Sequence, residues 1–188
     1  MALVDISYPT FDIETDIIYA SKNNFTGKAV YGRDACYLRE EAVPHMAEAI
    51  KLASQLGLRF RIFDAFRPTE AQWVLWNHTP DPNFLADPRR GSPHSRGVAV
   101  DLTLITKSKG EALEMGTNFD EFSPLSHHGN TKIKPAAQEN RHLLMGIMTT
   151  AGWDFYRNEW WHYQLFNSAQ YELINDNSLE IPMMPAKN

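Results

Sequence analysis

The chain has 188 residues, of which 43% are hydrophobic and 22% are charged, and its formal net charge is -5 at pH 7. This length suits one domain with a sizeable core, and the composition is that of an ordinary soluble globular protein. The acidic balance argues against a nucleic-acid partner, because phosphate binding requires a basic surface. No apolar run approaches the length of a membrane span, so we expect no membrane partner either.

The cysteine content and the N-terminus indicate which kinds of covalent and metal sites, and which cell compartment, to expect. One cysteine, Cys36, excludes an internal disulfide and a cysteine-ligated zinc site. Nothing near it in the sequence supplies a base, so we interpret it as a buried or idle thiol. The first residues lack the basic start and the apolar core of a secretory signal. We therefore expect a cytoplasmic protein, or a periplasmic one if this sequence is a processed form.

Residues 1–35 are mixed, with strand-like pieces at 17–19 and 29–31 between turn-forming residues. The tripeptide Thr26-Gly27-Lys28 invites comparison with a phosphate-binding loop. The upstream glycine of that motif is missing and no helical pattern follows, so we reject this interpretation.

The middle of the chain has a clearer pattern. Residues 40–55 repeat apolar side chains at helical steps, with Pro44 suited to the first turn and Gly57 to the stop. Residues 58–64 alternate as a strand, and a short helix is predicted over 69–76. A proline-rich loop then leads to a second alternating run. The strand face that we expect in the core carries Leu58, Phe60 and Ile62.

The second strand is predicted over residues 98–104, and it places Asp101 among small side chains on the face away from the core. Residues 106–134 are loop-like, 136–151 form another helix, and 153–166 are aromatic and strand-like. Helices among strands without regular βαβ alternation predict an α+β fold. We expect a single domain over 1–188, with its core at about 5–166 and a surface-lying tail over 167–188.

Two stretches carry the residues for a metal site. His94 and Asp101 lie seven positions apart with a glycine between them, and His162 follows Glu159 by three positions. Two imidazoles and a carboxylate suit a borderline divalent ion such as Zn²⁺. Three protein ligands leave a fourth position open, which is typical of a catalytic site, and Glu159 could then move protons.

These residues also have other interpretations. A lone histidine is more often a surface or hydrogen-bonded residue than a ligand. The pair His127-His128 is the main rival for a metal, but adjacent side chains diverge. A serine triad from Ser92, His94 and Asp101 lacks the Gly-x-Ser-x-Gly elbow, and side chains two apart on a strand project in parallel. We reject the triad.

Glu159 and Arg67 each have a plain alternative. On a regular strand Glu159 and His162 would point to opposite faces, so we place Glu159 at the start of the strand, where the backbone bends. The alternative is a solvated surface acid. Arg67 follows the strand 58–64 and could stabilise an oxyanion or hold a carboxylate. The alternative is a surface arginine paired with Asp64 or Glu70.

These motifs together resemble the zinc D-alanyl-D-alanine dipeptidases, relatives of the vancomycin-resistance dipeptidase. That family lies in a wider group of zinc D,D-peptidases that shares its fold with the hedgehog signalling domain. The resemblance covers roughly residues 5–166 and implies a small antiparallel sheet flanked by helices. The chain departs from the family pattern at two positions: Phe66 stands where many members have tyrosine, and Pro93 follows Ser92. The matching motifs are Ser92-x-His94-x-x-Gly97-x-Ala99-x-Asp101, with Asp64-Ala65-Phe66-Arg67-Pro68 before it and Glu159-x-Trp161-His162 after it.

The resemblance also implies roles. One zinc ion per chain would be bound by His94, Asp101 and His162. Glu159 would be the general base and acid, and Arg67 would stabilise the transition state. Ser92, Tyr19 and Asp120 would position the dipeptide. Of these, Tyr19 and Asp120 would lie toward its free amino group.

The expected reaction is hydrolysis of the small D,D-dipeptide D-Ala-D-Ala to two D-alanines. One alternative is a zinc D,D-carboxypeptidase acting on longer peptidoglycan peptides, which the missing export signal and wall-binding segment disfavour. The other is a non-catalytic, hedgehog-like zinc-binding module, which the presence of Glu159 and Arg67 disfavours.

Overall fold

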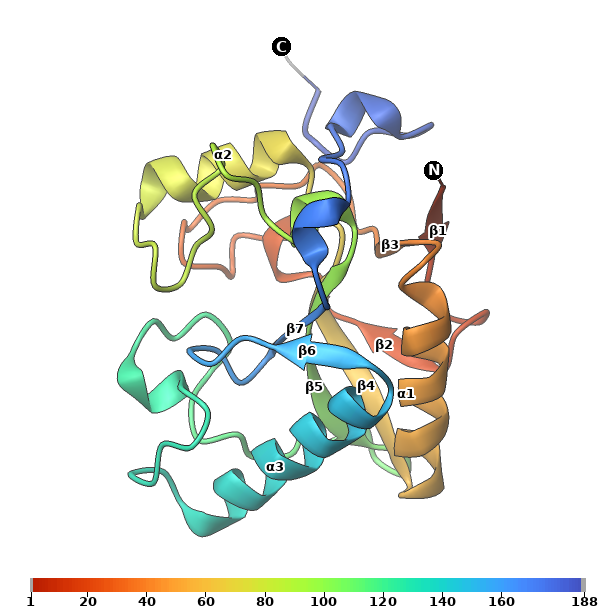
Figure 1. Cartoon of the computed structure of the whole chain (residues 1–188), viewed down its shortest axis with the longest axis vertical. Coiled ribbons are helices and arrows are strands. Elements are labelled where there is room, and N and C mark those ends of the chain that lie inside the picture. Colours follow the sequence, from red (N-terminus) through yellow and green to blue (C-terminus); the bar gives the residue numbers. More distant parts are fainter. Residues whose placement is uncertain (1, 187–188) are drawn as a thin grey trace.

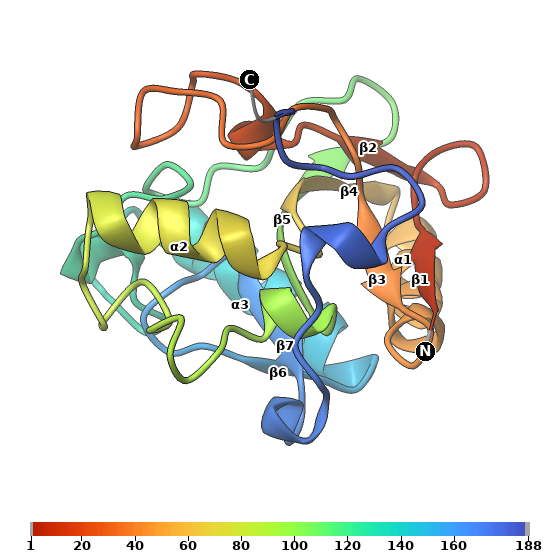
Figure 2. The same cartoon turned by 90° about the horizontal axis from the view of Figure 1, so that it is seen from above.

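The computed structural model describes residues 2–186, which form an α+β fold, as predicted (Figures 1 and 2). Three α-helices and seven strands occur among the described residues. In chain order these are β1 (Leu3–Asp5), β2 (Ile13–Thr15), β3 (Tyr37–Arg39), α1 (Val43–Gln55), β4 (Leu58–Asp64), α2 (Thr69–His78), β5 (Ala99–Thr106), α3 (Pro135–Thr150), β6 (Trp153–Phe155) and β7 (His162–Leu165).

The main sheet has the strand order β2-β4-β5-β7-β6, and β1 pairs with β3 in a separate two-stranded sheet. The strands β4, β5, β7 and β6 pair antiparallel, as expected. The edge strand β2 departs from that expectation, because it runs parallel to β4. The chain between β2 and β4 passes through β3 and α1, and this crossover returns it in the same direction.

One face of the sheet forms the core. Helix α1 packs against β4 and helix α3 packs against β6, and both lie along the same side of the sheet in Figure 1. Alternate residues of β5, among them Val100 and Leu102, are fully buried in this core. The predicted alternation is confirmed, and it leaves Asp101 on the opposite face.

Most of the predicted long elements are confirmed with shifted ends, but the strands predicted within residues 1–35 are wrong. The strand-like piece at 17–19 overlaps a 3₁₀ turn over Ile18–Ala20, and 29–31 lies in bends rather than a strand. The short strands β1, β2 and β3 were not predicted. The aromatic stretch 153–166 divides into β6 and β7, with a turn between them.

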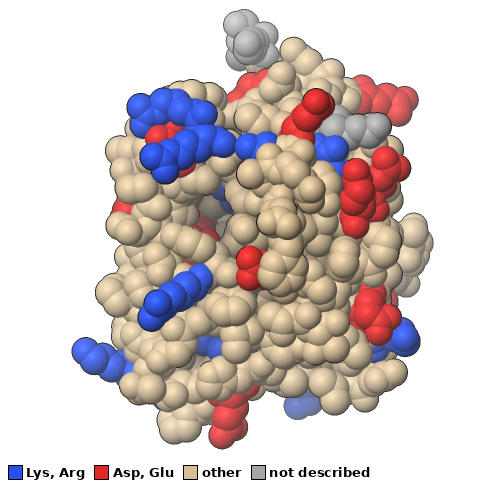
Figure 3. All heavy atoms as spheres, viewed as in Figure 1, with Lys and Arg blue, Asp and Glu red and all other residues tan. Residues whose placement is uncertain are grey.

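Two loops meet on one side of the molecule. The 79–91 loop follows α2, and the 107–134 loop connects β5 to α3. Both lie to the left in Figure 1, and the surface in the same view is hollowed between them (Figure 3). The cavity described below opens there.

The C-terminal tail lies along the surface and is fixed to it at a few points. Most of its side chains from Ser168 onward are at least partly exposed, but Ile174 and Met183 are buried. The backbone N–H of Asp176 donates to Glu70 of α2 at 3.0 Å. Within residues 2–186, no helix is both long enough and apolar enough to cross a bilayer.

Candidate active site and metal centre

His94, Asp101 and His162 converge on one point. All three are buried, and one ligand atom from each lies within 4.8 Å of the others. Sheet register brings two of the three residues together, because Asp101 of β5 is the direct cross-strand partner of His162 of β7. His94 lies in a 3₁₀ turn just before β5. Gly97 ends that turn with a φ of 71°, a conformation that glycine adopts without strain.

The hydrogen bonds of His94 fix which of its nitrogens faces the cluster. Its Nδ1 lies 2.7 Å from the carbonyl oxygen of Ala65, which can only accept, so Nδ1 carries the proton. The lone pair of Nε2 then points at Asp101 Oδ2, 3.3 Å away, and at His162 Nδ1, 3.1 Å away. Two acceptors at such distances repel unless a proton or a cation lies between them.

This donor set fits a divalent metal ion. Two imidazole nitrogens and a carboxylate oxygen are the ligands that zinc and similar ions prefer. Burial raises the pKa of the Asp101 carboxyl, but the neighbouring His94 and His162 outweigh burial and hold this pKa below its ordinary value. Asp101 therefore remains a carboxylate and can act as a ligand.

Glu159 lies where the sequence predicts it, in the turn before β7 rather than on the strand. Its backbone N–H donates to the carbonyl of Tyr156, and its Oε2 is 3.9 Å from His162 Nδ1. The side chain is buried, so the surface-acid alternative is wrong. Burial raises the pKa of the Glu159 carboxyl well above its ordinary value, and the charges of Asp101 and Asp120 raise it further. A carboxyl tuned in this direction can accept a proton and give it back.

Arg67 lies just after β4 and is buried, so a surface position is wrong, whereas the expected pairing with Asp64 is present. Asp64 holds it from one side, with Nε to Oδ2 at 2.8 Å, and Gln72 accepts from Nη1 at 2.9 Å. The guanidinium lies 5.1 Å above the ring of Tyr19, and Nη2 is 3.6 Å from Asp101 Oδ2. These contacts fix a positive charge beside the His94/Asp101/His162 cluster.

The three predicted dipeptide-positioning residues lie around the same space. Tyr19 donates its hydroxyl proton to Asp120 Oδ2 at 2.7 Å, and Asp120 has a φ of 55°, which aspartate tolerates better than most residues. Burial raises the pKa of Asp120 to about 8. Ser92 Oγ accepts from the backbone N–H of His94 at 3.2 Å.

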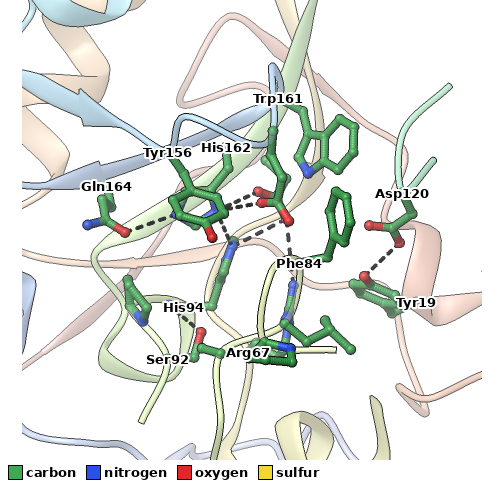
Figure 4. A pocket seen from close by; sticks show the side chains of 16 residues that line it. Tyr19, Arg67, Phe84, Ser92, His94, Asp120, Tyr156, Trp161, His162 and Gln164 are labelled. Atoms are coloured by element: carbon green, nitrogen blue, oxygen red, sulfur yellow. Dashed lines mark hydrogen bonds and ion pairs between the residues drawn. The ribbon is translucent and has the colours of Figure 1, made fainter. Parts of the chain in front are cut away.

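All eight predicted residues therefore line one cavity, of about 190 Å³ (Figure 4). The 79–91 loop closes one side of it with Phe84 and Leu85, and Tyr156 and Trp161 add aromatic walls. The complete lining is Tyr19, Arg67, Pro82, Phe84, Leu85, Ala86, Ser92, Pro93, His94, Asp101, Asp120, Tyr156, Glu159, Trp161, His162 and Gln164.

The rival histidine pair takes no part in the cluster. His127 packs near Phe84, whereas His128 packs against the rings of Phe155 and Tyr163, so the two side chains diverge as expected. Among the described residues, the His94/Asp101/His162 cluster is the one group of three or more His, Cys, Asp or Glu residues arranged to hold a metal ion.

Several residues of the site were not singled out from the sequence. Gln164 lies two residues after His162, and the period of a strand could have placed it on the same face. Gln72, which accepts from Arg67, lies on α2 and gives no comparable signal. Phe84 and Tyr156 come from a loop and a turn, where no periodicity shows which way a side chain points.

The sequence is similar to known proteins over most of its length. Residues 1–183 match the sequence pattern of the Peptidase_M15 family, described as D-ala-D-ala dipeptidase. A D-alanyl-D-alanine dipeptidase of Escherichia coli is 43% identical over 174 residues, which cover 93% of this chain and 90% of the relative. One of Enterococcus faecalis is 34% identical over 175 residues, covering 82% and 87%. A crystal structure of a vancomycin-resistance D,D-pentapeptidase with Zn(II) aligns with a TM-score of 0.47 and 14% identity over 73% of this chain and 78% of the other.

Proposed function

The chain belongs to the D-ala-D-ala dipeptidase family of metallopeptidases, and on that premise we propose that it hydrolyses D-alanyl-D-alanine to two D-alanines with one zinc ion. One observation carries the proposal. In a single cavity, a three-ligand cluster has a buried carboxyl 3.9 Å from one ligand and a buried arginine 3.6 Å from another. Metal-assisted hydrolysis needs these three components together.

The zinc ion would be held by His94 Nε2, His162 Nδ1 and the Asp101 carboxylate. When bound, it would supply a Lewis acid that lowers the pKa of a water molecule and polarises the scissile carbonyl. The hydrogen bond from His94 Nδ1 to Ala65 keeps that ring oriented for this role.

Glu159 moves the protons. Its carboxylate takes a proton from the attacking water as the new C–O bond forms at the scissile carbonyl. The carboxyl then gives a proton to the amide nitrogen as the C–N bond breaks, which releases D-alanine with a neutral amine. The raised pKa of Glu159 lies closer to the pKa values of the attacking water and of the leaving amine. General acid–base catalysis of this kind typically increases the reaction rate by about 10²- to 10⁴-fold.

Arg67 stabilises the negative charge that develops on the carbonyl oxygen. Asp64 and Gln72 hold its guanidinium in place before the reaction, so little reorganisation is needed. A typical oxyanion donor contributes about 3–4 kcal/mol to the transition state, and we assign Arg67 a contribution of this order.

The cavity also offers groups that would position the dipeptide. Asp120, held by Tyr19, is the carboxyl group for the free ammonium of the dipeptide, whose positive charge would favour the charged form of Asp120. Ser92 lies on the cavity wall beside His94. Phe84 and Tyr156 enclose the space, so a small dipeptide fits this site better than a long peptidoglycan strand.

The test is the release of free D-alanine from D-Ala-D-Ala, with and without added zinc, by the wild type and Glu159→Gln. We expect zinc-dependent release by the wild type and a loss of at least about 10²-fold in the variant, which retains its zinc. The control is Glu139→Gln, because Glu139 is exposed on α3 and does not line the cavity. Release from a pentapeptide but not from the dipeptide would replace the proposal with a D,D-carboxypeptidase. Bound zinc without release from either would leave a binding module.

A further inference from the structure

Gln164 contacts His162, one of the three residues of the His94/Asp101/His162 cluster. It follows His162 by two residues on β7, so both side chains project from the same face of the strand. Its Oε1 lies 3.1 Å from His162 Nε2, the ring nitrogen that faces away from Asp101 and His94 (Figure 4). We propose that Gln164 is a positioning residue for the metal site, because its Oε1 accepts a hydrogen bond from the Nε2–H of His162 and so keeps the Nδ1 lone pair free for the ion. The inference rests on the proposed zinc site.

The proposal follows from the single proton of a neutral imidazole. His162 Nδ1 lies 3.0 Å from Asp101 Oδ1 and 3.1 Å from His94 Nε2, and both of these atoms are acceptors. They attract the ring proton of His162 to Nδ1, where it would block metal binding. An acceptor at Nε2 opposes that attraction, because it stabilises the tautomer with the proton on the far nitrogen.

His94 and His162 differ in the group that accepts the ring proton's hydrogen bond. Ala65 uses a backbone carbonyl to fix His94, and no side-chain substitution removes that oxygen. Gln164 uses a side chain to fix His162, so its contribution can be removed by mutation. The backbone that carries Gln164 is held on both sides, since it pairs with Ala99 of β5 and Asp154 of β6. A substitution there should leave the strand in place.

Two substitutions separate the hydrogen bond from the shape of the side chain. Gln164→Leu keeps much of the volume and removes the acceptor. Gln164→Glu keeps an acceptor at the same distance from the backbone. Loss of a partner to a ligating histidine typically weakens metal affinity by about 10- to 100-fold, and we expect a weakening of this order in Gln164→Leu. We expect Gln164→Glu to bind zinc at least as tightly as the wild type.

The experiment measures zinc affinity by competition with a chromophoric chelator, using zinc chloride as the probe. A second measurement records the ¹⁵N spectrum of the imidazoles in the zinc-loaded protein. The ring proton on His162 Nε2 should exchange slowly in the wild type and in Gln164→Glu, and rapidly in Gln164→Leu. A merely structural role in the strand would not change this proton. The matched control is Gln170→Leu, because Gln170 is exposed and lies outside the cavity.

The possible results are distinct. Equal zinc affinity in Gln164→Leu and the wild type would overturn the inference while leaving the zinc site intact. Equal weakening in Gln164→Leu and Gln164→Glu would also overturn it, because it would assign the effect to packing. A wild type that binds no zinc would overturn both this inference and the proposed function.

Discussion

The two sides of the cavity are built by different means. On the metal side, Asp101 and His162 are cross-strand partners, and the pairing of β5 with β7 fixes their separation. On the opposite side, Tyr19 and Asp120 are 101 residues apart in sequence, and a single hydrogen bond of 2.7 Å joins their side chains. Sheet register places the first pair. The second pair depends on how two irregular segments pack.

A buried arginine helps to hold the loop side together. Arg141 of α3 donates to the carbonyl oxygens of Met115 at 2.6 Å, Leu125 at 2.9 Å and His127 at 3.2 Å. Its guanidinium also lies 5.8 Å from the centre of the Trp160 ring. One side chain with five donors can thus satisfy several carbonyls of a loop and hold that loop to α3. This positions the 107–134 loop, and with it Asp120.

The largest effect should come from the metal side. His162→Ala removes one of the three proposed ligands, so we expect both zinc binding and D-alanine release to fall below detection. Zinc content and product release measure the two effects. The control is His142→Ala, since His142 is exposed on α3. A His162→Ala protein that retains stoichiometric zinc would contradict the ligand assignment.

Arg67→Lys should have the next largest effect, with zinc binding unchanged. Lysine keeps the positive charge but not the planar fork that reaches Asp64 and Gln72 together. We expect kcat to fall by about 10²- to 10³-fold, the usual consequence of losing an oxyanion donor. Steady-state kinetics beside zinc titration measure this. A change in KM alone would place Arg67 in substrate binding instead.

Asp120→Asn tests the loop side directly. The amide can still accept a hydrogen bond from Tyr19, but it offers no charge to the substrate's ammonium. We expect kcat/KM for D-Ala-D-Ala to fall by about 10- to 100-fold, the range for losing a hydrogen bond to a charged group. N-acetylated D-Ala-D-Ala lacks that ammonium, so its kcat/KM should change much less. Equal losses for both substrates would remove Asp120 from amino-group recognition.

The smallest effect concerns stability in acid. Burial lowers the pKa of His128 to about 4, below the ordinary value near 6.5. The unfolded chain therefore binds this proton first, and stability falls as the pH drops from about 6.5 to about 4. We expect this group to contribute a loss of about 1–2 kcal/mol, because the ring is partly exposed.

Urea unfolding at pH 7 and pH 4.5 measures that loss. The carboxylates of the whole chain also titrate in this interval, so the informative quantity is the difference between the wild type and His128→Phe. The phenylalanine ring can occupy the contacts with Phe155 and Tyr163 without binding a proton. An identical pH dependence in the two proteins would show that His128 is not the group responsible.

The elements that could be predicted are those with long, regular patterns. The strand predicted over residues 58–64 matches β4, because its alternation extends over seven residues. The strands β1, β2 and β3 have three residues each and were missed. Three residues show no period, and such strands form because a neighbour is available for pairing.

The sequence by itself determined the kinds of groups in the site and their order along the chain. His94, Asp101, Glu159 and His162 carry their chemistry in their side chains, and their short local spacings within two motifs are visible without a fold. Burial is different, since it depends on what packs around a residue. Arg67 and Glu159 each had a plausible surface alternative, and only the packed structure excluded it.

Only the tertiary structure decided how the distant segments meet. The register of β5 against β7 pairs Asp101 with His162, and the bulge between Ile62 and Asp64 in β4 sets Asp64 opposite Asp101. The meeting of Tyr19 with Asp120 likewise follows from backbone paths and side-chain rotamers. Local periodicity reports which face of an element is buried. The distance between atoms of different elements is fixed only when the whole core packs.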